Sequence, residues 1–248
     1  MPLIGNHELL LINLDRSKDR LARSIEQLTK YDLDYIRIPA VDGEQLSEQA
    51  IQTHTKADYR DYYKTLRVGE IGCYLSHRKC WERVLEKSLD YAIILEDDFV
   101  LEEDLGSLPE LLSNIEQSWD CIKLLEYPEK RNAVQSFAYG DKTLFRYDKI
   151  PSRTCAYVIS KSGASKMLKH SEKVGRPVDI DFQYWWESDI QVFGLKPYLV
   201  SVNTNEVSTI ESPNSTEIVG KSVVKQFVQK WYFLYANNKY LKRVLNKR

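Results

Sequence analysis

The chain has 248 residues, a formal net charge of −1 and 43% hydrophobic residues, so one domain with a substantial core is expected. A charged fraction of 29% is ordinary for a globular protein and argues against a disordered or fibrous chain. Apolar runs stay well short of the ~20 residues that a membrane-spanning helix needs, and the N-terminus does not resemble a secretory signal. The cysteines lack C-x-x-C spacing, as is typical of reduced thiols. We therefore expect a cytoplasmic protein, and no nucleic-acid partner.

Strand and helix signals alternate along the chain. We expect strands at 9–14, 35–38, 91–95, 121–125 and 155–159, because each is a short, mostly apolar run. Helices are expected from about 18 after the capping residue Ser17, at about 46–53, at about 69–87, and from Ser160 to Lys169. This order predicts an α/β fold with a mainly parallel, mixed sheet.

Polar residues follow several of these strands. Asn13, Asp42 and the run Glu96-Asp97-Asp98 all lie at predicted carboxyl ends. In open α/β sheets, ligands bind beyond the carboxyl ends of the strands. These side chains are therefore expected to meet in one cleft.

Three adjacent carboxylates, Glu96, Asp97 and Asp98, end the apolar strand 91–95. Carboxylates this close repel one another and raise each other's pKa unless a cation is present. Hard oxygen ligands suit Mg²⁺ or Mn²⁺, especially when a diphosphate supplies the other ligands. The alternative is that these acids simply open a loop or cap the next helix.

The last 28 residues differ from the rest of the chain. Eight of the 35 basic residues and none of the 36 acidic residues fall at 221–248, so residues 1–220 carry a net charge of −9. Apolar residues recur there at roughly helical spacing, after a Ser-Pro-Asn stretch near residue 215. We expect a main domain at 1–215 and a basic amphipathic helical segment at 216–248. That helix either lies on an anionic membrane or docks its apolar face on the domain.

Six segments resemble glycosyltransferase family 25, which includes lipopolysaccharide-type and collagen glycosyltransferases. They are INLDRSKDR at 12–20, AVDG at 40–43, GEIGCYLSH at 69–77, ILEDD at 94–98, AYVISKSGASKML at 156–168 and PVDIDF at 177–182. Their order and spacing are similar to the family pattern over about residues 8–215. GEIGCYLSH followed some twenty residues later by LEDD is the most specific part.

The resemblance implies a GT-A-type fold, with a Rossmann-like sheet that binds a nucleotide sugar and a D-x-D-like motif that holds a metal. Glu96-Asp97-Asp98 occupies that motif here. We expect Asp98, with Glu96, to bind Mn²⁺ or Mg²⁺, and Glu96 or Asp97 to contact the donor ribose or sugar. The same resemblance places PVDIDF on the acceptor side, so Asp179 or Asp181 is the expected catalytic base. One of the two could instead cap the following helix.

Further donor-binding residues are expected in the matching segments. They are Asn13, Arg16, Asp42, Gly43, Glu70, Ser76, His77 and Arg153. Arg16 and Arg20 could reach a phosphate or base, or could lie on a solvated helix face, and His77 has the alternative of a hydrogen-bonded core histidine. Trp185 and Trp186 either stack on an acceptor sugar or belong in part to the core. A zinc site at Cys73, His77 and Cys80 is rejected, because seven residues of helix rise about 10 Å, too far for ligands of one ion.

The predicted function is a metal-dependent, inverting glycosyltransferase that uses a UDP-hexose, first of all UDP-galactose. The acceptor is expected to be a lipooligosaccharide core on the cytoplasmic face of the membrane. The missing signal peptide favours this over the collagen-modifying branch. Alternatives are a glucosyltransferase of the same family, a non-catalytic nucleotide- or carbohydrate-binding module, and a hydrolase of nucleotide diphosphates.

Overall fold

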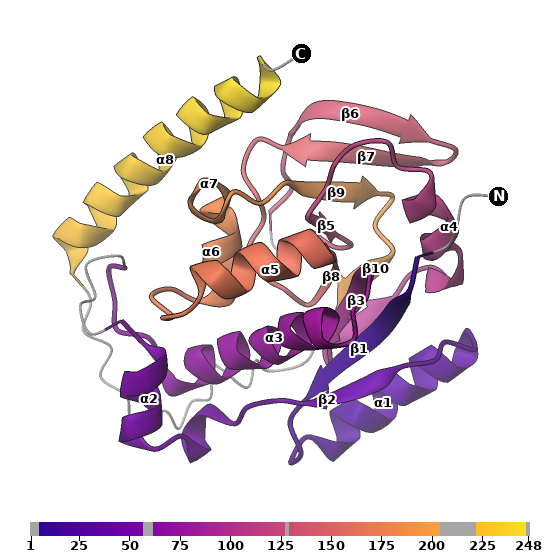
Figure 1. Cartoon of the computed structure of the whole chain (residues 1–248), viewed down its shortest axis with the longest axis horizontal. Coiled ribbons are helices and arrows are strands. Elements are labelled where there is room, and N and C mark those ends of the chain that lie inside the picture. Colours follow the sequence, from indigo (N-terminus) through magenta and orange to yellow (C-terminus); the bar gives the residue numbers. More distant parts are fainter. Residues whose placement is uncertain (1–4, 57–61, 127–128, 204–221, 247–248) are drawn as a thin grey trace.

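A computed structural model describes residues 5–56, 62–126, 129–203 and 222–246 of the chain. Its centre is an eight-stranded sheet with helices on both faces (Figure 1). The strands of this sheet are β1 (His7–Asn13), β2 (Ile36–Pro39), β3 (Tyr91–Glu96), β5 (Cys121–Lys123), β6 (Ala133–Tyr139), β7 (Lys142–Tyr147), β8 (Ala156–Ser160) and β9 (Val192–Lys196). A separate two-stranded sheet pairs β4 (Phe99–Leu101) with β10 (Val200–Val202).

The helices follow the same alternating order along the chain. They are α1 (Lys18–Lys30), α2 (Glu48–His54), α3 (Val68–Glu86), α4 (Leu108–Ser113), α5 (Lys161–His170), α6 (Val178–Gln183), α7 (Trp185–Ser188) and α8 (Val223–Leu245), with 3₁₀ turns η1 (Gly43–Gln45) and η3 (Leu105–Ser107). The elements expected from the sequence are all present within a few residues. The α/β prediction is confirmed.

The strand order of the large sheet is β2-β1-β3-β8-β5-β9-β7-β6. β1 runs parallel to β2 and β3, and β5 parallel to β9, whereas β8 and β7 run antiparallel to their neighbours. The sheet is therefore mixed. It is mainly parallel in the sense that most of its described strands point the same way, with β8 and β7 reversed. This direction brings the carboxyl ends of β1, β3 and β5 to one edge, which positions the site described below.

Alternating side chains of the buried strands divide the core into two layers. Leu10 and Ile94 face the layer covered by α3, α5 and α6, where Trp81 and Met167 are fully buried. Leu11 and Leu95 face the opposite layer, which α1 and α4 cover with Leu28 and other apolar residues. Strands buried on both faces read as continuous apolar runs, which is why β1 and β3 were recognisable from sequence.

Helix α8 crosses the outside of the molecule beyond α6 and α7 (Figure 1). Its C-terminal half packs on the body, because Phe233 and Ala236 are buried and the Asn237 side chain accepts a hydrogen bond of 3.1 Å from Trp185 Nε1. The expected division at residue 215 lies outside the described residues. None of the described helices is both long and apolar enough to cross a membrane.

Candidate functional site

The acidic run lies at the carboxyl edge of the sheet. Glu96 is the last residue of β3, and Asp97 and Asp98 form the turn into β4. Asn13, at the end of the neighbouring strand β1, lies beside them. The predicted meeting of strand-end side chains is thus present for this pair of strands.

Asp97 is held from two sides. Its Oδ2 accepts a hydrogen bond of 2.6 Å from Asn13 Nδ2, and its Oδ1 lies 2.7 Å from the Arg20 guanidinium on α1. Asn13 is itself buried and accepts hydrogen bonds from Arg37. Burial raises the pKa of Asp97 to about 6, although Arg20 and Asn13 act in the opposite direction. Asn13 and Arg20 therefore account for the position of Asp97, and a direct contact of Asn13 with uridine stays a prediction.

Glu96 belongs to a buried hydrogen-bonded chain. Its Oε1 accepts from Thr154 Oγ1 at 2.6 Å and lies 3.1 Å from His77 Nε2. Burial would raise the pKa of Glu96, but His77, Thr154 and Lys123 outweigh it and the pKa is lowered. Glu96 is thus held as a carboxylate in a fixed orientation.

The tautomer of His77 follows from its other neighbours. Trp81 Nε1 donates to the Tyr157 hydroxyl at 3.0 Å, and that hydroxyl lies 2.8 Å from His77 Nδ1. If the Tyr157 hydroxyl accepted from both, its own proton would be buried without an acceptor, which is costly. Tyr157 therefore donates to Nδ1, and His77 Nε2 carries the proton that Glu96 accepts.

One further group of ligand-type atoms adjoins this chain. Potential ligand atoms of Cys73, His77 and Glu96 lie within 4.8 Å of one another. However, a metal there would have to displace the proton on His77 Nε2 and disrupt the chain from Trp81. The rejected zinc site with Cys80 also does not form, because Cys80 is fully buried and is not part of this group.

Asp98 has the features of a metal ligand. Its Oδ1 is buried and makes no hydrogen bond of ordinary geometry among the described residues, although the Cys155 thiol lies close enough to act on the carboxyl pKa. Its Oδ2 lies 3.8 Å from Arg20 and 4.0 Å from Arg153, beyond hydrogen-bonding distance. Burial and the nearby charge of Glu96 raise the pKa of Asp98. An orphaned buried carboxylate oxygen is the kind of group that a bound Mn²⁺ or Mg²⁺ would satisfy, so the residues present fit the expected metal.

Asp179 and Asp181 occupy different surroundings. Asp181 is buried and accepts from Tyr74 at 2.5 Å and from Arg176 Nε at 2.9 Å, with His170 at 3.2 Å. Burial alone would raise its pKa, but His170, Arg176 and Tyr74 together lower it. Its oxygens are thus committed to a structural network.

Asp179, in the first turn of α6, is half-buried. Its Oδ2 accepts from the Arg153 backbone N–H at 3.1 Å, and its Oδ1 from the N–H of Ile180 at 2.8 Å. Neither contact is a charged side chain. The carboxylate is therefore oriented and keeps lone pairs for a ligand.

Two comparisons with known proteins identify the family. The model of "Glycosyltransferase family 25 (LPS biosynthesis protein)" matches residues 6–182. The chain belongs to glycosyltransferase family 25. Human procollagen galactosyltransferase 2 is 29% identical over 225 residues, which cover 79% of this chain and 35% of that protein. The human inactive glycosyltransferase 25 family member 3 is 31% identical over 225 residues, covering 80% and 37%.

This family 25 chain spans little more than a third of the length of those two relatives. One relative is named as a galactosyltransferase and the other as inactive, so membership alone leaves activity open. Among solved structures, a complex of a Drosophila β-1,4-galactosyltransferase 7 mutant with manganese, UDP-Gal and xylobiose is similar at a TM-score of 0.36 and 10% identity. That likeness covers 82% of this chain and 77% of the other.

Several predicted donor-site residues of the family 25 chain make structural contacts. Gly43 and Gly72 pack backbone to backbone: a Cβ on Gly43 would lie 1.9 Å from the Val68 carbonyl oxygen. The Ser76 hydroxyl accepts from the Val41 N–H at 2.8 Å and donates to Gly72 O at 2.7 Å. Ser76 and Gly43 therefore hold the start of α3 against the preceding loop. Their contact with a donor stays a prediction.

Three charged residues of the same region also have partners in the protein. Glu70 accepts from the Arg67 N–H at 2.9 Å and from Lys64 at 2.6 Å, which caps α3. Arg16 is half-exposed and pairs with Asp42, which also accepts from the N–H of Glu44. A donor phosphate or base would have to compete with these contacts, and their predicted roles remain untested.

Two basic residues of the site were either missed in the sequence or left open. Lys123, at the end of β5, is 1% exposed and donates to the carbonyl of Arg153, and burial lowers the pKa of its amine. Arg20, expected to reach a phosphate or base or to lie on a solvated face, instead pairs with Asp97 at 2.7 Å and lies 3.8 Å from Asp98. The signal for Lys123 was available: a lysine at the carboxyl end of a buried strand.

Arg153 lies between these groups. Its backbone φ of 68° falls in the left-handed region, which a residue with a side chain rarely adopts. Its N–H faces Asp179, its carbonyl accepts from Lys123, and its guanidinium approaches Asp98. The prediction of Arg153 as a diphosphate contact is compatible with this position, but is not tested by it.

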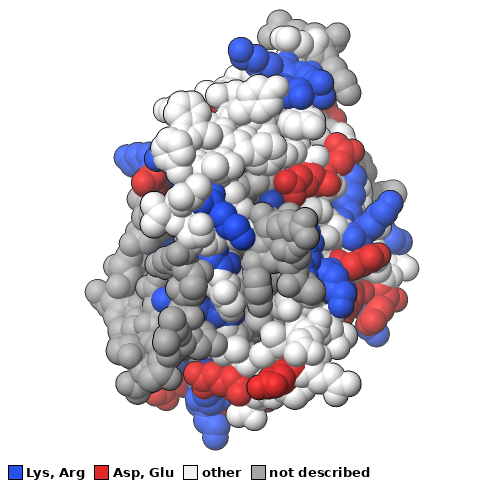
Figure 2. Space-filling model, turned by 90° about the vertical axis from the view of Figure 1, so that its left-hand side faces the viewer, with Lys and Arg blue, Asp and Glu red and all other residues white. Residues whose placement is uncertain are grey.

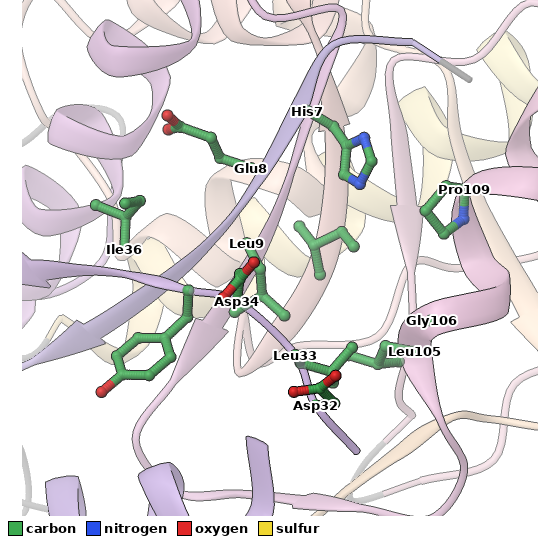
Figure 3. Close-up of a pocket in the computed structure, with 12 residues that line it drawn as sticks. His7, Glu8, Leu9, Asp32, Leu33, Asp34, Ile36, Leu105, Gly106 and Pro109 are labelled. Carbon is green, nitrogen blue, oxygen red and sulfur yellow. The ribbon is translucent and has the colours of Figure 1, made fainter. Parts of the chain in front are cut away.

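Two hollows lined by described residues lie elsewhere. One, of about 370 Å³, is bounded by His7, Asp34, Ile36 and Pro109 among others, at the amino end of β1 (Figure 3). The other lies between α8 and the hairpin β6–β7 and includes Trp185 and Trp186. Trp186 stacks on Tyr240 of α8 at 5.9 Å, so the two tryptophans anchor α8, in line with the core alternative.

Proposed function

We propose that this family 25 chain is a metal-dependent, inverting glycosyltransferase that moves a hexose from a UDP-sugar to the core of a lipooligosaccharide. The buried, unpartnered Oδ1 of Asp98 carries the proposal, because Asp97, Arg20 and Glu96 hold the same turn in a fixed geometry. A buried carboxylate oxygen without a partner supports a bound cation at this turn, and release of UDP separates a catalytic from a non-catalytic use of that cation.

Asp98 would hold the metal, with Glu96 as a second carboxylate ligand. Mn²⁺ or Mg²⁺, when bound, supplies the positive charge that the departing diphosphate requires. Arg153 lies on the same side as Asp98 and adds a further cation for the donor phosphates. Asp97 remains paired with Arg20 and Asn13, which suits a positioning role or a contact with the donor ribose.

Asp179 is the proposed base. It would take the proton from the acceptor hydroxyl while that oxygen forms a bond to the anomeric carbon and the bond from this carbon to the diphosphate breaks. One base suffices for inversion, because no covalent enzyme intermediate forms. Asp181 instead fixes the start of α6 through Arg176 and Tyr74, and thereby the position of Asp179.

Galactose is the proposed sugar because a relative at 29% identity is named as a procollagen galactosyltransferase. UDP-glucose is the alternative, since the two donors differ only at O4. The lipooligosaccharide acceptor follows from the family description as an LPS biosynthesis protein. We propose that the reaction takes place at the cytoplasmic face of the membrane, with residues 1–215 as the catalytic domain and 216–248 as an appended segment that contains α8.

A non-catalytic binding module is the second candidate, because a relative at 31% identity is named as inactive. UDP release from UDP-galactose and UDP-glucose, with Mn²⁺ or EDTA, separates the two. We expect slow Mn²⁺-dependent release from one donor even without acceptor, and its loss in Asp98→Asn.

Asp141→Asn is the matched control, since that carboxylate is 85% exposed and lies in the β6–β7 turn. UDP binding by calorimetry without release from either donor would favour the binding module. Failure to bind UDP in the presence of Mn²⁺ would contradict the transferase and leave a carbohydrate-binding module standing.

A further inference from the structure

The N-terminal half of α8 exposes an unusual number of large apolar side chains. Eight of them are exposed between Val223 and Tyr235, with Val223 at 77%, Phe227 at 62%, Trp231 at 62% and Tyr235 at 65%. In contrast, Phe233 and Ala236 are buried against the body of the protein. The helix is therefore apolar on two opposite sides, of which only one is covered.

The exposed side chains form one continuous face. With 3.6 residues per turn, the eight positions fall within an arc of about 180°. Phe233, Ala236 and Tyr240 lie on the other side, where Tyr240 stacks on Trp186. An apolar half-cylinder of this extent on a protein surface marks an interaction site.

Positive charge borders this face. Lys225 and Lys230 lie just outside its two edges, and Lys239 and Lys242 continue along it toward the C-terminus. The whole segment 221–248 contains no acidic residue. Figure 2 shows the result: a broad uncharged area in the upper part of this side of the molecule, with Lys and Arg side chains at its upper end.

We propose that the face of α8 from Val223 to Tyr235 docks in the headgroup region of an anionic lipid bilayer. An apolar face with Trp and Tyr, flanked by lysines, has the composition of a helix that lies in a membrane interface. A second copy of the chain fits less well, because a two-fold contact would bring the same lysine-bordered face against itself.

The first turn of α8 is tied to the segment that precedes α3. The N–H of Ser222, which caps α8, donates to the Tyr63 carbonyl at 3.0 Å, and the Tyr63 ring lies 4.7 Å from that of Tyr62. A role of this surface in bringing the enzyme to a lipid-linked acceptor rests on the proposed function, whereas its binding to a bilayer does not.

Flotation of the full chain with vesicles tests the proposal. The vesicles are phosphatidylcholine alone or with about 30% phosphatidylglycerol, without any sugar donor or acceptor. We expect binding to the anionic vesicles, a shift of tryptophan emission to shorter wavelength, and weaker binding at high salt. Phe227→Ser with Trp231→Ser, and separately Lys225→Glu with Lys230→Glu, should each lower the partition roughly tenfold or more.

Matched controls use exposed residues elsewhere. Ile36, which is 39% exposed on the edge strand β2, is replaced by serine as the apolar control. Lys18→Glu with Lys87→Glu repeats the charge change away from α8. Thermal unfolding and calorimetric UDP binding show whether each variant remains folded. The proposal is overturned if folded protein does not bind anionic vesicles, if the controls lower binding as much as the α8 variants, or if the α8 variants instead convert a dimer to a monomer. Vesicle binding without UDP binding would contradict the proposed function and leave the docking surface standing.

Discussion

Asp179 and Asp181 lie two residues apart, yet their replacement by asparagine should have opposite consequences. Asp181→Asn removes the charge from a buried network, in which Arg176 has a side chain only 4% exposed. Loss of one partner of a buried ion pair costs about 3–5 kcal/mol. We expect the lower end, about 3 kcal/mol, because Glu187 still faces Arg176. For a chain of this size that corresponds to a fall in Tm of roughly 6–12 °C.

Asp179→Asn should leave the fold nearly intact. Asparagine keeps one of the two side-chain oxygens that accept from backbone N–H groups, and loss of the other should lower the free energy of unfolding by about 1 kcal/mol. The turnover number for UDP release should fall by about 10²–10⁴, the usual contribution of a general base. Calorimetric affinity for UDP with Mn²⁺ should change little.

The assay measures Tm and Mn²⁺-dependent UDP release for both variants, with Asp141→Asn as the exposed control. Folded Asp181→Asn protein, assayed well below its Tm, should retain more activity than Asp179→Asn. The reasoning is refuted if Asp179→Asn releases UDP at the native rate. It is equally refuted if Asp181→Asn keeps the native Tm and loses all activity, because Asp181 would then be the base.

Three further outcomes are expected. Gly43→Ala places a Cβ against a backbone carbonyl and should lower Tm by several degrees, more than Gly175→Ala, where the nearest atom belongs to the flexible Lys56 side chain; equal Tm values would contradict this. Tyr157→Phe should cost about 1–3 kcal/mol and release the fixed Nε2–H tautomer of His77, seen in ¹⁵N NMR; an unchanged tautomer would argue against the chain from Trp81. Affinity for Mn²⁺ should fall as the pH drops, because protons compete with the metal for Asp98, whose pKa is raised, and because protonation of the neighbouring Asp97, with a pKa of about 6, removes a negative charge beside the metal. A pKa raised by folding means that protonation favours the folded state, so the metal-free Tm should not be lowered by these two groups over the same pH range.

The parts of the fold that could be predicted are those that local patterns encode. β1 and β3 are continuous apolar runs, and Ser160 caps α5 through a hydrogen bond from the Gly163 N–H. The hairpin β6–β7 was missed, because β6 is an edge strand whose side chains are largely exposed and lack a clear apolar pattern. The pair Gly140-Asp141 was the turn signal available in the sequence, and Gly140 has a φ of 61° in the structure.

The candidate site divides in the same way. Glu96, Asp97 and Asp98 were recognisable because acids rarely follow a buried strand without a reason. The distinction between Asp179 and Asp181 could not be predicted, since Tyr74 lies 107 residues from Asp181 along the chain and contacts it only in the folded protein. Whether a carboxylate is structural or available is a property of such distant partners.

The tripeptide 153–155 shows why the two halves of the site cannot vary independently. The Arg153 N–H positions Asp179, the Thr154 hydroxyl positions Glu96, and the Cys155 carbonyl accepts the Glu96 N–H at 2.7 Å. Lys123 donates to the Arg153 carbonyl of the same tripeptide. Arg153 has a left-handed backbone conformation, which costs energy for a residue other than glycine. A change in this tripeptide therefore displaces the proposed base relative to the proposed metal ligands, even when every acidic residue is retained. Loss of activity in a relative of this fold consequently does not require the loss of any carboxylate.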